Sequence, residues 1–458
     1  MDKNWKIETL AVQAGYEPKD GESRILPLVQ STTYKYDDVQ SVADLFDLKK
    51  SGFFYSRLAN PTVDCFEKKI AAMEKGVMAV ALSSGQAANA YSLLNIAKCG
   101  DHILALSSLY GGTVSLFTNT LKKAGVEITF VTPDAGYDEV IAAIRPNTKA
   151  VFVESLANPA LVVADFELYA KAAHANGIPL IVDNTFPTPV LCNPFDFGAD
   201  IVTHSTTKYI DGHATSVGGI VVEKGDFDWA ASGKFPEFTE PDESYHGVVY
   251  TRDFAAAPFS VKLRVQLVRD YGIPQAPLNA FLSHLGCETL PLRIERHSEN
   301  ALEVAKFLKN HPNVSWVNYP GLPESPEYAK VQKYFRNGMA SGVLCFGVKG
   351  GKAAGERTMN ALKLANIVVH VADVRTGVLH PASMTHRQLS DSELIAAGVS
   401  PDLIRLSAVR PRAASRRKPH SSSGKHLRSS SWSSSFTASS TGVFTLASSS
   451  CSAWICCW

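Results

Sequence analysis

The chain has 458 residues, 45% of them hydrophobic and 19% charged, a composition typical of a globular protein with a large buried core. Its 45 lysines and arginines nearly balance 44 aspartates and glutamates, so no overall positive charge favours nucleic-acid binding. There is no run of 18 apolar residues, no signal-peptide pattern and no Cys-x-x-Cys pair among the eight cysteines, so we expect a cytoplasmic protein without a membrane span, a zinc site or a disulfide framework.

Regular alternation of strand and helix patterns begins near residue 61, after a mixed segment at 1–60. Apolar, β-branched runs predict six strands, at 102–106, 127–131, 150–155, 179–183, 200–205 and 218–223. Helical patterns separate most of them, the clearest at 86–97 and 165–177. Strands that are buried on both faces and alternate with helices predict an α/β fold with a mostly parallel central sheet and helices on both faces. Ligands of such sheets bind at the carboxyl ends of the strands.

The predicted helix at 86–97 has a clear apolar period. Four small or apolar residues recur at helical spacing, and we expect them to form its buried face: Ala87, Ala90, Tyr91 and Leu94. The helix at 165–177 ends at a glycine, which is a common stop signal.

A second, smaller α+β domain is predicted to follow. Residues 226–258 are rich in Pro, Glu and Tyr and indicate a loop. A helical region from 278 to 309 comes next, and strand patterns at 313–320 and 342–348 lead to a helix near 352–364. The chain is therefore expected to divide into an N-terminal segment, a large cofactor-binding domain, a small C-terminal domain and a tail, at 1–60, 61–257, 258–407 and 408–458.

The tail at 408–458 differs in composition from the rest of the chain. It holds 16 serines, three of the six tryptophans and three of the eight cysteines, but no Asp or Glu. It has no helical or strand period and too little apolar surface to offset its ordering entropy, so we expect it to be disordered. Translation in a shifted reading frame, or a wrong gene-model end, gives such a composition.

The strongest chemical signal is the segment THSTTKY at 203–209. It follows a predicted strand and so places Ser205, Thr207 and Lys208 in a loop at a carboxyl strand end. A lone lysine at such a position is usually a solvated surface charge. Hydroxyls that can bind a phosphate, beside an amine that can form an imine, are instead what pyridoxal phosphate needs.

This cofactor would also need a carboxylate at its pyridine nitrogen, an anion site for its phosphate and a partner for its ring. Asp183 ends a predicted strand, although such an aspartate often serves only a turn. Gly85 and Gln86 begin a predicted helix, whose first amides can bind an anion, although the two serines before them also fit a plain helix cap. Tyr110 follows another strand and could stack on a flat ring, although a lone aromatic is more often part of a core.

The whole sequence resembles the Cys/Met-metabolism family of pyridoxal-phosphate enzymes, which have the aspartate-aminotransferase-like fold type I. The resemblance covers nearly all of residues 5–407, and its matching stretches are YSRLANPT (55–62), SSGQAA (83–88), LYGGT (109–113), ESLANP (154–159), IVDNTF (181–186), HSTTKYIDGH (204–213), GGIVV (218–222), CETLPLRIERH (287–297), LHPASMTHRQL (379–389) and LIRLS (403–407). It implies an enzyme of this fold type with pyridoxal 5′-phosphate as its cofactor and no metal ion.

The resemblance also implies roles for single residues. Lys208 and Tyr110 would be catalytic, the first joined covalently to the cofactor and the second stacked on its ring. Asp183 would pair with the pyridine nitrogen, and Asn158 would lie near the 3-hydroxyl. The cofactor's phosphate would be bound by Gly85, Gln86, Ser205 and Thr207.

Further roles concern the substrate and a second subunit. Tyr55 and Arg57 would reach the phosphate of a neighbouring subunit, so the resemblance implies a homo-oligomer, a tetramer built from dimers that share active sites. Arg405 would hold the substrate α-carboxylate through its planar, bidentate guanidinium. Thr376 occupies the Ser/Thr position near that carboxylate.

Within the family, the insertion at 235–250 and the segment LHPASMTHRQLS at 379–390 resemble the O-acetylhomoserine sulfhydrylase branch. These enzymes replace the acetate of O-acetyl-L-homoserine with sulfide or methanethiol, which gives homocysteine or methionine. The alternative activities are those of cystathionine γ-synthase, which uses cysteine as the nucleophile, and methionine γ-lyase, which uses water.

Two departures from the family pattern have consequences. Gly377 stands where the family has leucine, which implies a looser backbone near the carboxylate site. After LIRLS the chain reads AVRPRAASRRK in place of the family's final helix. An inactive relative with a defective C-terminus is therefore the alternative to an enzyme.

Overall fold

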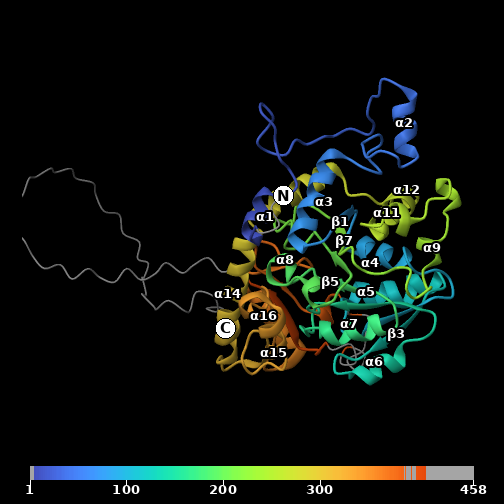
Figure 1. The fold of residues 1–458 in the computed structure, drawn as a ribbon. Coiled ribbons are helices and arrows are strands. Elements are labelled where there is room, and N and C mark those ends of the chain that lie inside the picture. The colour runs from blue at the N-terminus through green and yellow to red at the C-terminus, as the bar shows by residue number, and fades with distance from the viewer. Residues whose placement is uncertain (1–4, 386, 388–393, 395–398, 409–458) are drawn as a thin grey trace, which may run out of the picture.

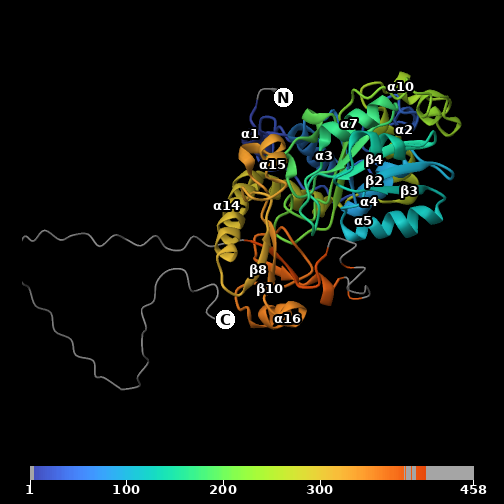
Figure 2. The same ribbon diagram turned by 90° about the horizontal axis from the view of Figure 1, so that it is seen from below.

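The computed structural model describes residues 5–385, 387, 394 and 399–408. Two β-sheets organise them, a seven-stranded sheet from the first half of the chain and a five-stranded sheet from the second (Figures 1 and 2). The predicted fold class, α/β with a mostly parallel central sheet and a smaller C-terminal sheet, is confirmed. The tail predicted at 408–458 lies outside the described residues apart from Ala408.

The large sheet has the strand order β1-β7-β6-β5-β4-β2-β3. Its strands are β1 (Met78–Leu82), β2 (His102–Leu106), β3 (Glu127–Val131), β4 (Thr148–Glu154), β5 (Leu180–Asp183), β6 (Ile201–His204) and β7 (Gly219–Glu223). Strand β7 is antiparallel to both its neighbours, whereas the pairs from β6 to β3 are all parallel. The other strands therefore point the same way, and their carboxyl ends share one edge.

The six predicted strands are all present, and β1 is an additional strand that the sequence analysis missed. Its residues Ala79 and Ala81 have low strand propensity, so the segment gave a weak signal. Burial explains why it is nevertheless a strand, because Val80 and Leu82 are completely buried.

Helices cover both faces of this sheet, with α4 and α5 on one side and α7 on the other (Figure 2). The helices of this part are α3 (Pro61–Glu74), α4 (Gly85–Leu94), α5 (Gly111–Ser115), α6 (Tyr137–Ala143), α7 (Phe166–Ala175) and α8 (Thr188–Leu191). Side-chain caps mark where two of them begin: Asn60 accepts from Thr62 N at 2.9 Å before α3, and Ser84 accepts from Ala87 N at 3.1 Å before α4.

The predicted apolar face of α4 packs against the core, with Ala87 buried, but it is not the most buried face of the helix. Ala90, Tyr91 and Leu94 are only partly buried, whereas the polar residues Asn89 and Ser92 are buried. Asn89 is turned inward because it has hydrogen-bond partners at the ends of β5 and β6, which a count of apolar residues does not detect.

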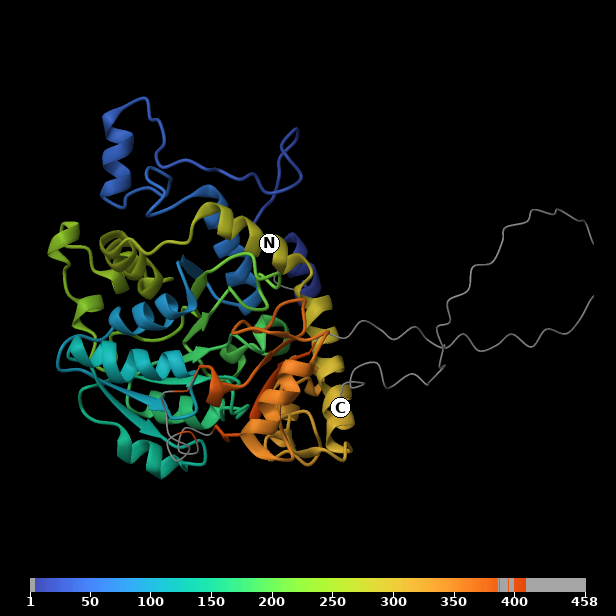
Figure 3. The ribbon, with the colours of Figure 1, turned by 180° about the vertical axis from the view of Figure 1, so that it is seen from behind.

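The N-terminal segment contains α1 (Ile7–Gln13) and α2 (Val39–Phe46). Helix α1 packs against α3, but α2 and the chain around it stand away from the rest of the molecule (Figures 1 and 3). The loop predicted at 226–258 is more ordered than expected. It forms α9 (Pro236–Thr239) and α10 (Tyr250–Asp253) around a cluster of aromatic rings from Trp229, Phe235, Phe238 and Phe259.

The second half of the chain surrounds the small sheet, whose strand order is β10-β11-β12-β9-β8. Its strands are β8 (Val314–Asn318), β9 (Val343–Val348), β10 (Asn366–Ile367), β11 (Gly377–Leu379) and β12 (Leu403–Ser407). Its helices, and those that lead to it, are α11 (Pro258–Leu263), α12 (Arg269–Tyr271), α13 (Pro277–Glu288), α14 (Leu290–Lys309), α15 (Tyr328–Tyr334) and α16 (Gly351–Ala361). Short π- or 3₁₀-helical turns are η1 (Leu116–Leu121), η2 (Pro194–Phe197), η3 (Glu243–Tyr245), η4 (Arg264–Val268), η5 (Arg336–Gly338) and η6 (Pro381–Ser383).

The structure places Gly377, where a looser backbone was expected, in a strand. Gly377 lies in β11 and is paired with Ser407 of β12. A Cβ atom at this position would lie 2.7 Å from Val368 Cγ2, so a neighbouring side chain occupies the space that a larger residue would need.

Within the described part of the chain, no helix combines the length and the apolar character that a membrane crossing requires.

Candidate active site

The carboxyl ends of β4, β5 and β6 bring several of the predicted residues together. Glu154, Asp183 and Thr203 are neighbours across these three strands. Ser205 and Lys208 belong to the turn that directly follows β6. The parallel topology thus places Lys208 at the sheet edge where Asp183 ends its strand, as the sequence pattern predicts.

Asp183 is held by donors from two directions. Its Oδ2 accepts from Asn89 Nδ2 at 2.9 Å, and its Oδ1 accepts from Thr185 N at 3.1 Å and from Thr185 Oγ1 at 2.5 Å. Asn89 is fixed in turn because its Oδ1 accepts from Thr203 Oγ1 at 2.6 Å. Asn89 and Thr185 were missed by the sequence analysis, and Thr185, two residues after Asp183, could have been found from its position in IVDNTF.

The predicted phosphate site lies where α4 begins. Ala87 N donates to Ser84 Oγ and Ala88 N donates to Ser84 O. The two amides before them, of Gly85 and Gln86, are therefore the ones that can donate to an anion. Gly85 is close to the turn after β6, because a Cβ added to it would lie 2.5 Å from Ser205 Cβ. A glycine is therefore required for this approach.

Thr207 has a more constrained hydroxyl than its predicted role suggests. Its Oγ1 donates to Gly218 O at 3.1 Å and accepts from Gly218 N at 3.0 Å. Ser205 N donates to Thr185 Oγ1 at 2.8 Å, which links this turn to the residue that holds Asp183. Thr206 Oγ1 is buried and has no hydrogen-bond partner within the residues described.

Lys208 is half-buried, and its environment changes its acidity. Burial, and after it the positive charge of Arg405, lower the pKa of its amine to about 8, against the opposing effect of Asp373. Near neutral pH, Lys208 is therefore neutral more often than an ordinary surface lysine, and a neutral amine is the form that acts as a nucleophile or a base.

Tyr110 is joined to the same edge through Glu154. Its backbone N donates to Glu154 Oε1 at 2.7 Å, while its side chain is 48% exposed. Burial raises the pKa of Glu154, and the nearby negative charge of Asp183 raises it as well. The aromatic ring is thus anchored at its backbone and free to contact a bound molecule.

Arg405 comes from the small sheet and meets the large one. Its Nη1 donates to Asn158 Oδ1 at 3.2 Å and its Nη2 donates to Val369 O at 3.0 Å. Only 6% of the residue is exposed, and burial lowers the pKa of the guanidinium. Thr376 is buried just before β11, the strand that pairs with β12. Arg405 and Asn158 are therefore brought together, and the guanidinium is held in one orientation by these two hydrogen bonds.

The contacts of Tyr55 and Arg57 within this chain are with residues outside the strand-end group. The Arg57 guanidinium lies 5.3 Å from the centre of the Tyr55 ring, and Arg57 Nη1 donates to Arg269 O. Both residues line a cavity of about 2330 Å³ between the N-terminal segment and the large sheet's helices, and its lining includes neither Lys208 nor Asp183.

The residues at the strand ends fit pyridoxal phosphate. They supply an amine of lowered pKa, a carboxylate fixed by hydrogen bonds, an open aromatic ring, and helix amides beside Ser205 for a phosphate. Among the residues described, no group of His, Cys, Asp and Glu side chains is arranged to hold a metal ion.

Comparisons with known proteins agree with this geometry. The family described as Cys/Met metabolism PLP-dependent enzyme matches residues 8–409. Homocysteine synthase of Schizosaccharomyces pombe is 48% identical over 87% of this chain and 94% of its own length. O-acetyl-L-homoserine sulfhydrylase of Leptospira meyeri is 44% identical over 89% and 94%. The crystal structure of an O-acetylhomoserine (thiol)-lyase from Campylobacter jejuni, which carries N'-pyridoxyl-lysine-5'-monophosphate, is 38% identical with a TM-score of 0.85 and covers 88% of this chain and 96% of its own.

Proposed function

The chain belongs to the family of PLP-dependent enzymes of Cys/Met metabolism, and we propose that it transfers the aminocarboxypropyl group of O-acetyl-L-homoserine to sulfide. The Cγ–O bond of the ester breaks and acetate leaves, a Cγ–S bond forms, and the product is homocysteine. Methanethiol in place of sulfide would give methionine. The observation that carries this proposal is the similarity, along almost their whole length, to enzymes named for this reaction.

The cofactor of the family, when bound, supplies an electron sink that stabilises negative charge at the carbon beside the substrate's amino group. We propose that Lys208 holds it and then moves protons at Cα and Cβ, since a pKa of about 8 makes the neutral amine available. Asp183, held by Asn89 and Thr185, would keep a proton on the pyridine nitrogen. Tyr110 would contact the ring from its exposed side.

For substrate binding, we propose that Arg405 receives the α-carboxylate. Its guanidinium now donates to Asn158 and to Val369 O at 3.0–3.2 Å, so it is held in place and needs little reorganisation to accept a carboxylate. Thr376, just before β11, would line the same position.

The phosphate site would be completed by a second copy of the chain. Tyr55 and Arg57 line the large cavity of the N-terminal segment, which Lys208 does not line, and this supports a homo-oligomer in which one chain supplies these residues to its neighbour. We propose a tetramer of such dimers, located in the cytoplasm.

The decisive assay supplies the purified, cofactor-loaded protein with O-acetyl-L-homoserine and sulfide, with cysteine, or with neither. We expect homocysteine and acetate in equal amounts with sulfide. Faster turnover with cysteine would identify a cystathionine γ-synthase, and turnover without any thiol would identify a lyase. Replacing the acetyl with the succinyl ester tests the leaving group. Absence of turnover in a protein that binds the cofactor would identify an inactive relative.

A further inference from the structure

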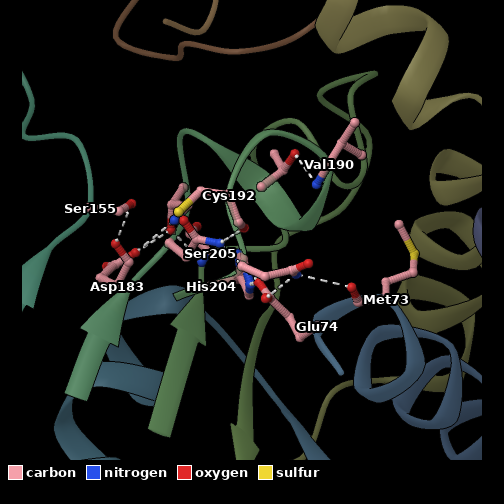
Figure 4. A network of polar contacts seen from close by, with 12 residues as sticks. Met73, Glu74, Ser155, Asp183, Val190, Cys192, His204 and Ser205 are labelled. Atoms are coloured by element: carbon pink, nitrogen blue, oxygen red, sulfur yellow. Dashed lines mark hydrogen bonds and ion pairs between the residues drawn. The ribbon is translucent and has the colours of Figure 1, made fainter. Parts of the chain in front are cut away.

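A buried carboxylate outside the proposed catalytic set joins the ends of the strands that carry this set. Glu74 is the last residue of α3, and its side chain is completely buried. Its Oε1 accepts from His204 Nε2 at 2.5 Å and from Asn184 Nδ2 at 3.0 Å, and its Oε2 accepts from Asn193 Nδ2 at 3.0 Å. Figure 4 shows Glu74 beside His204, with Ser205 and Asp183 next in the same network.

The partners of Glu74 are the immediate neighbours of site residues. His204 is the last residue of β6 and precedes Ser205, while Asn184 directly follows Asp183 at the end of β5. Asn184 also donates through its backbone to Thr203 O at 2.9 Å and through its side chain to Cys192 O at 2.9 Å. A single carboxylate therefore fixes both strand ends against α3.

Hydrogen bonding defines the direction of this network. The two asparagine amides can only donate through Nδ2, so Glu74 must be the acceptor of these bonds. His204 Nδ1 is buried without a hydrogen-bond partner among the residues described, which places the ring hydrogen on Nε2, facing the carboxylate. A buried carboxylate is tolerated only when such donors surround it. Glutamine at position 74 would place its NH₂ group opposite one of these donors, and the two groups could not hydrogen-bond.

We propose that Glu74 is a positioning residue for the cofactor. Through Asn184 and His204 it sets the spacing between Asp183, which would meet the pyridine nitrogen, and the turn from Ser205 to Lys208, which would meet the phosphate and the reactive carbon. This inference rests on the proposed function only in assuming pyridoxal phosphate as the bound group. Glu74 itself touches neither the cofactor nor the substrate.

The test compares Glu74→Gln with a matched control, Glu223→Gln. Glu223 is also buried, and it accepts from Phe259 N at 3.1 Å and Ser260 N at 2.7 Å. It is paired with Ile201, the first residue of β6, so it lies at the opposite edge of the same sheet. Glu223→Gln therefore removes an equally buried carboxylate that has no contact with the strand-end residues.

Both variants are stripped of cofactor and titrated with pyridoxal phosphate, and their melting temperatures are recorded. We expect both to melt earlier than the unaltered protein. We expect only Glu74→Gln to weaken cofactor binding beyond this general effect, by about 10- to 100-fold, the loss of affinity that removing the hydrogen-bond partners of binding groups typically causes at metal sites. Equal cofactor affinities in the two variants would overturn the proposal.

A second pair of variants decides the question if Glu74→Gln does not fold. His204→Gln keeps a nitrogen donor near the position of Nε2, whereas His204→Leu removes it. The glutamine variant should retain most of the cofactor affinity that the leucine variant loses, and equal affinities would again overturn the proposal. Because the measured quantity is binding, a failure of the sulfide assay with normal cofactor binding would reject the proposed reaction and leave this inference untouched.

Discussion

The strand-end site and the N-terminal segment differ in how far one chain completes them. At the strand ends, Asp183 and Arg405 have hydrogen-bond partners from several elements of the same chain. In the N-terminal segment, Val39 is 86% exposed, Ile25 60% and Phe46 54%, and α2 stands away from the molecule. Large apolar side chains left open in this way indicate a surface that another molecule covers. The residues proposed to hold the ring are therefore organised within one chain, and we propose that the rest of the phosphate site needs a second chain.

The largest effect is expected from Lys208→Ala, which tests whether the strand-end residues form the active site. Turnover should fall by about 10²- to 10⁴-fold or more, because in the proposed roles of Lys208 the variant would lose both the covalent attachment and the base. Borohydride reduction of the loaded unaltered protein, followed by peptide mapping, should place the pyridoxyl group on Lys208.

The chain offers a matched control in Lys262. This lysine is also buried, with its pKa lowered to about 8 by burial, but it donates to Asn95 O at 3.0 Å and lies 5.2 Å from the centre of the Phe238 ring. Lys262 thus has a similarly lowered pKa but lies outside the strand-end site. A pyridoxyl group found on Lys262 would show that the strand-end site has been wrongly identified.

Mixing two kinds of inactive chain tests whether a second chain completes the phosphate site. Arg57→Ala and Lys208→Ala should each have little activity alone. If dimers exchange at random, half contain one chain of each kind, and one of their two sites is intact, so about a quarter of the unaltered activity should return. Mixed dimers that form, as shown by differently tagged chains, but stay inactive would mean that Arg57 serves its own chain.

The two regions were also unequally predictable from the sequence. Lys208 and Asp183 follow strands with strong apolar patterns, so their shared edge could be derived from the topology rule alone. The roles of Arg405, Asn158 and Arg57 came only from the family resemblance, since no local pattern links residues so far apart. Asn89 was missed because a polar residue on the buried side of a helix contradicts the apolar period, and its partners on two strands become visible only in three dimensions.

Arg405→Lys should have a smaller effect, confined to substrate binding. Lysine keeps the charge but cannot donate from two nitrogens in one plane. The loss of a charge-assisted hydrogen bond of about 1.5–3 kcal/mol should raise the KM for O-acetyl-L-homoserine by about 10- to 100-fold. Cofactor affinity, measured by titration of the cofactor-free protein, should stay unchanged. A parallel loss of cofactor affinity would show that Arg405 supports the fold of the site instead.

The acidity of Lys208 gives a pH-dependent test of the same contact. Burial and then Arg405 lower the pKa of this amine to about 8, so in the cofactor-free protein its labelling by an amine-reactive reagent should rise with pH and reach half its maximum near pH 8. In Arg405→Gln the positive charge is absent, and the midpoint should move to a higher pH. A midpoint that does not move would mean that Arg405 has no electrostatic influence on the reactive amine.

The smallest effect is expected at Gly377, where the small sheet departs from the family. The family's leucine, introduced as Gly377→Leu, would bring Cβ to 2.7 Å from Val368 Cγ2. Overpacking of this kind costs about 1–3 kcal/mol, which urea unfolding can measure. Val368→Ala alone should also destabilise the protein, but the double variant should be more stable than the sum of the two changes predicts, because the alanine makes room for the leucine. If Gly377→Leu alone is more stable than the unaltered protein, the strand can shift to accept the family's residue. If the changes in unfolding free energy of the two single variants simply add up in the double variant, the leucine does not clash with Val368.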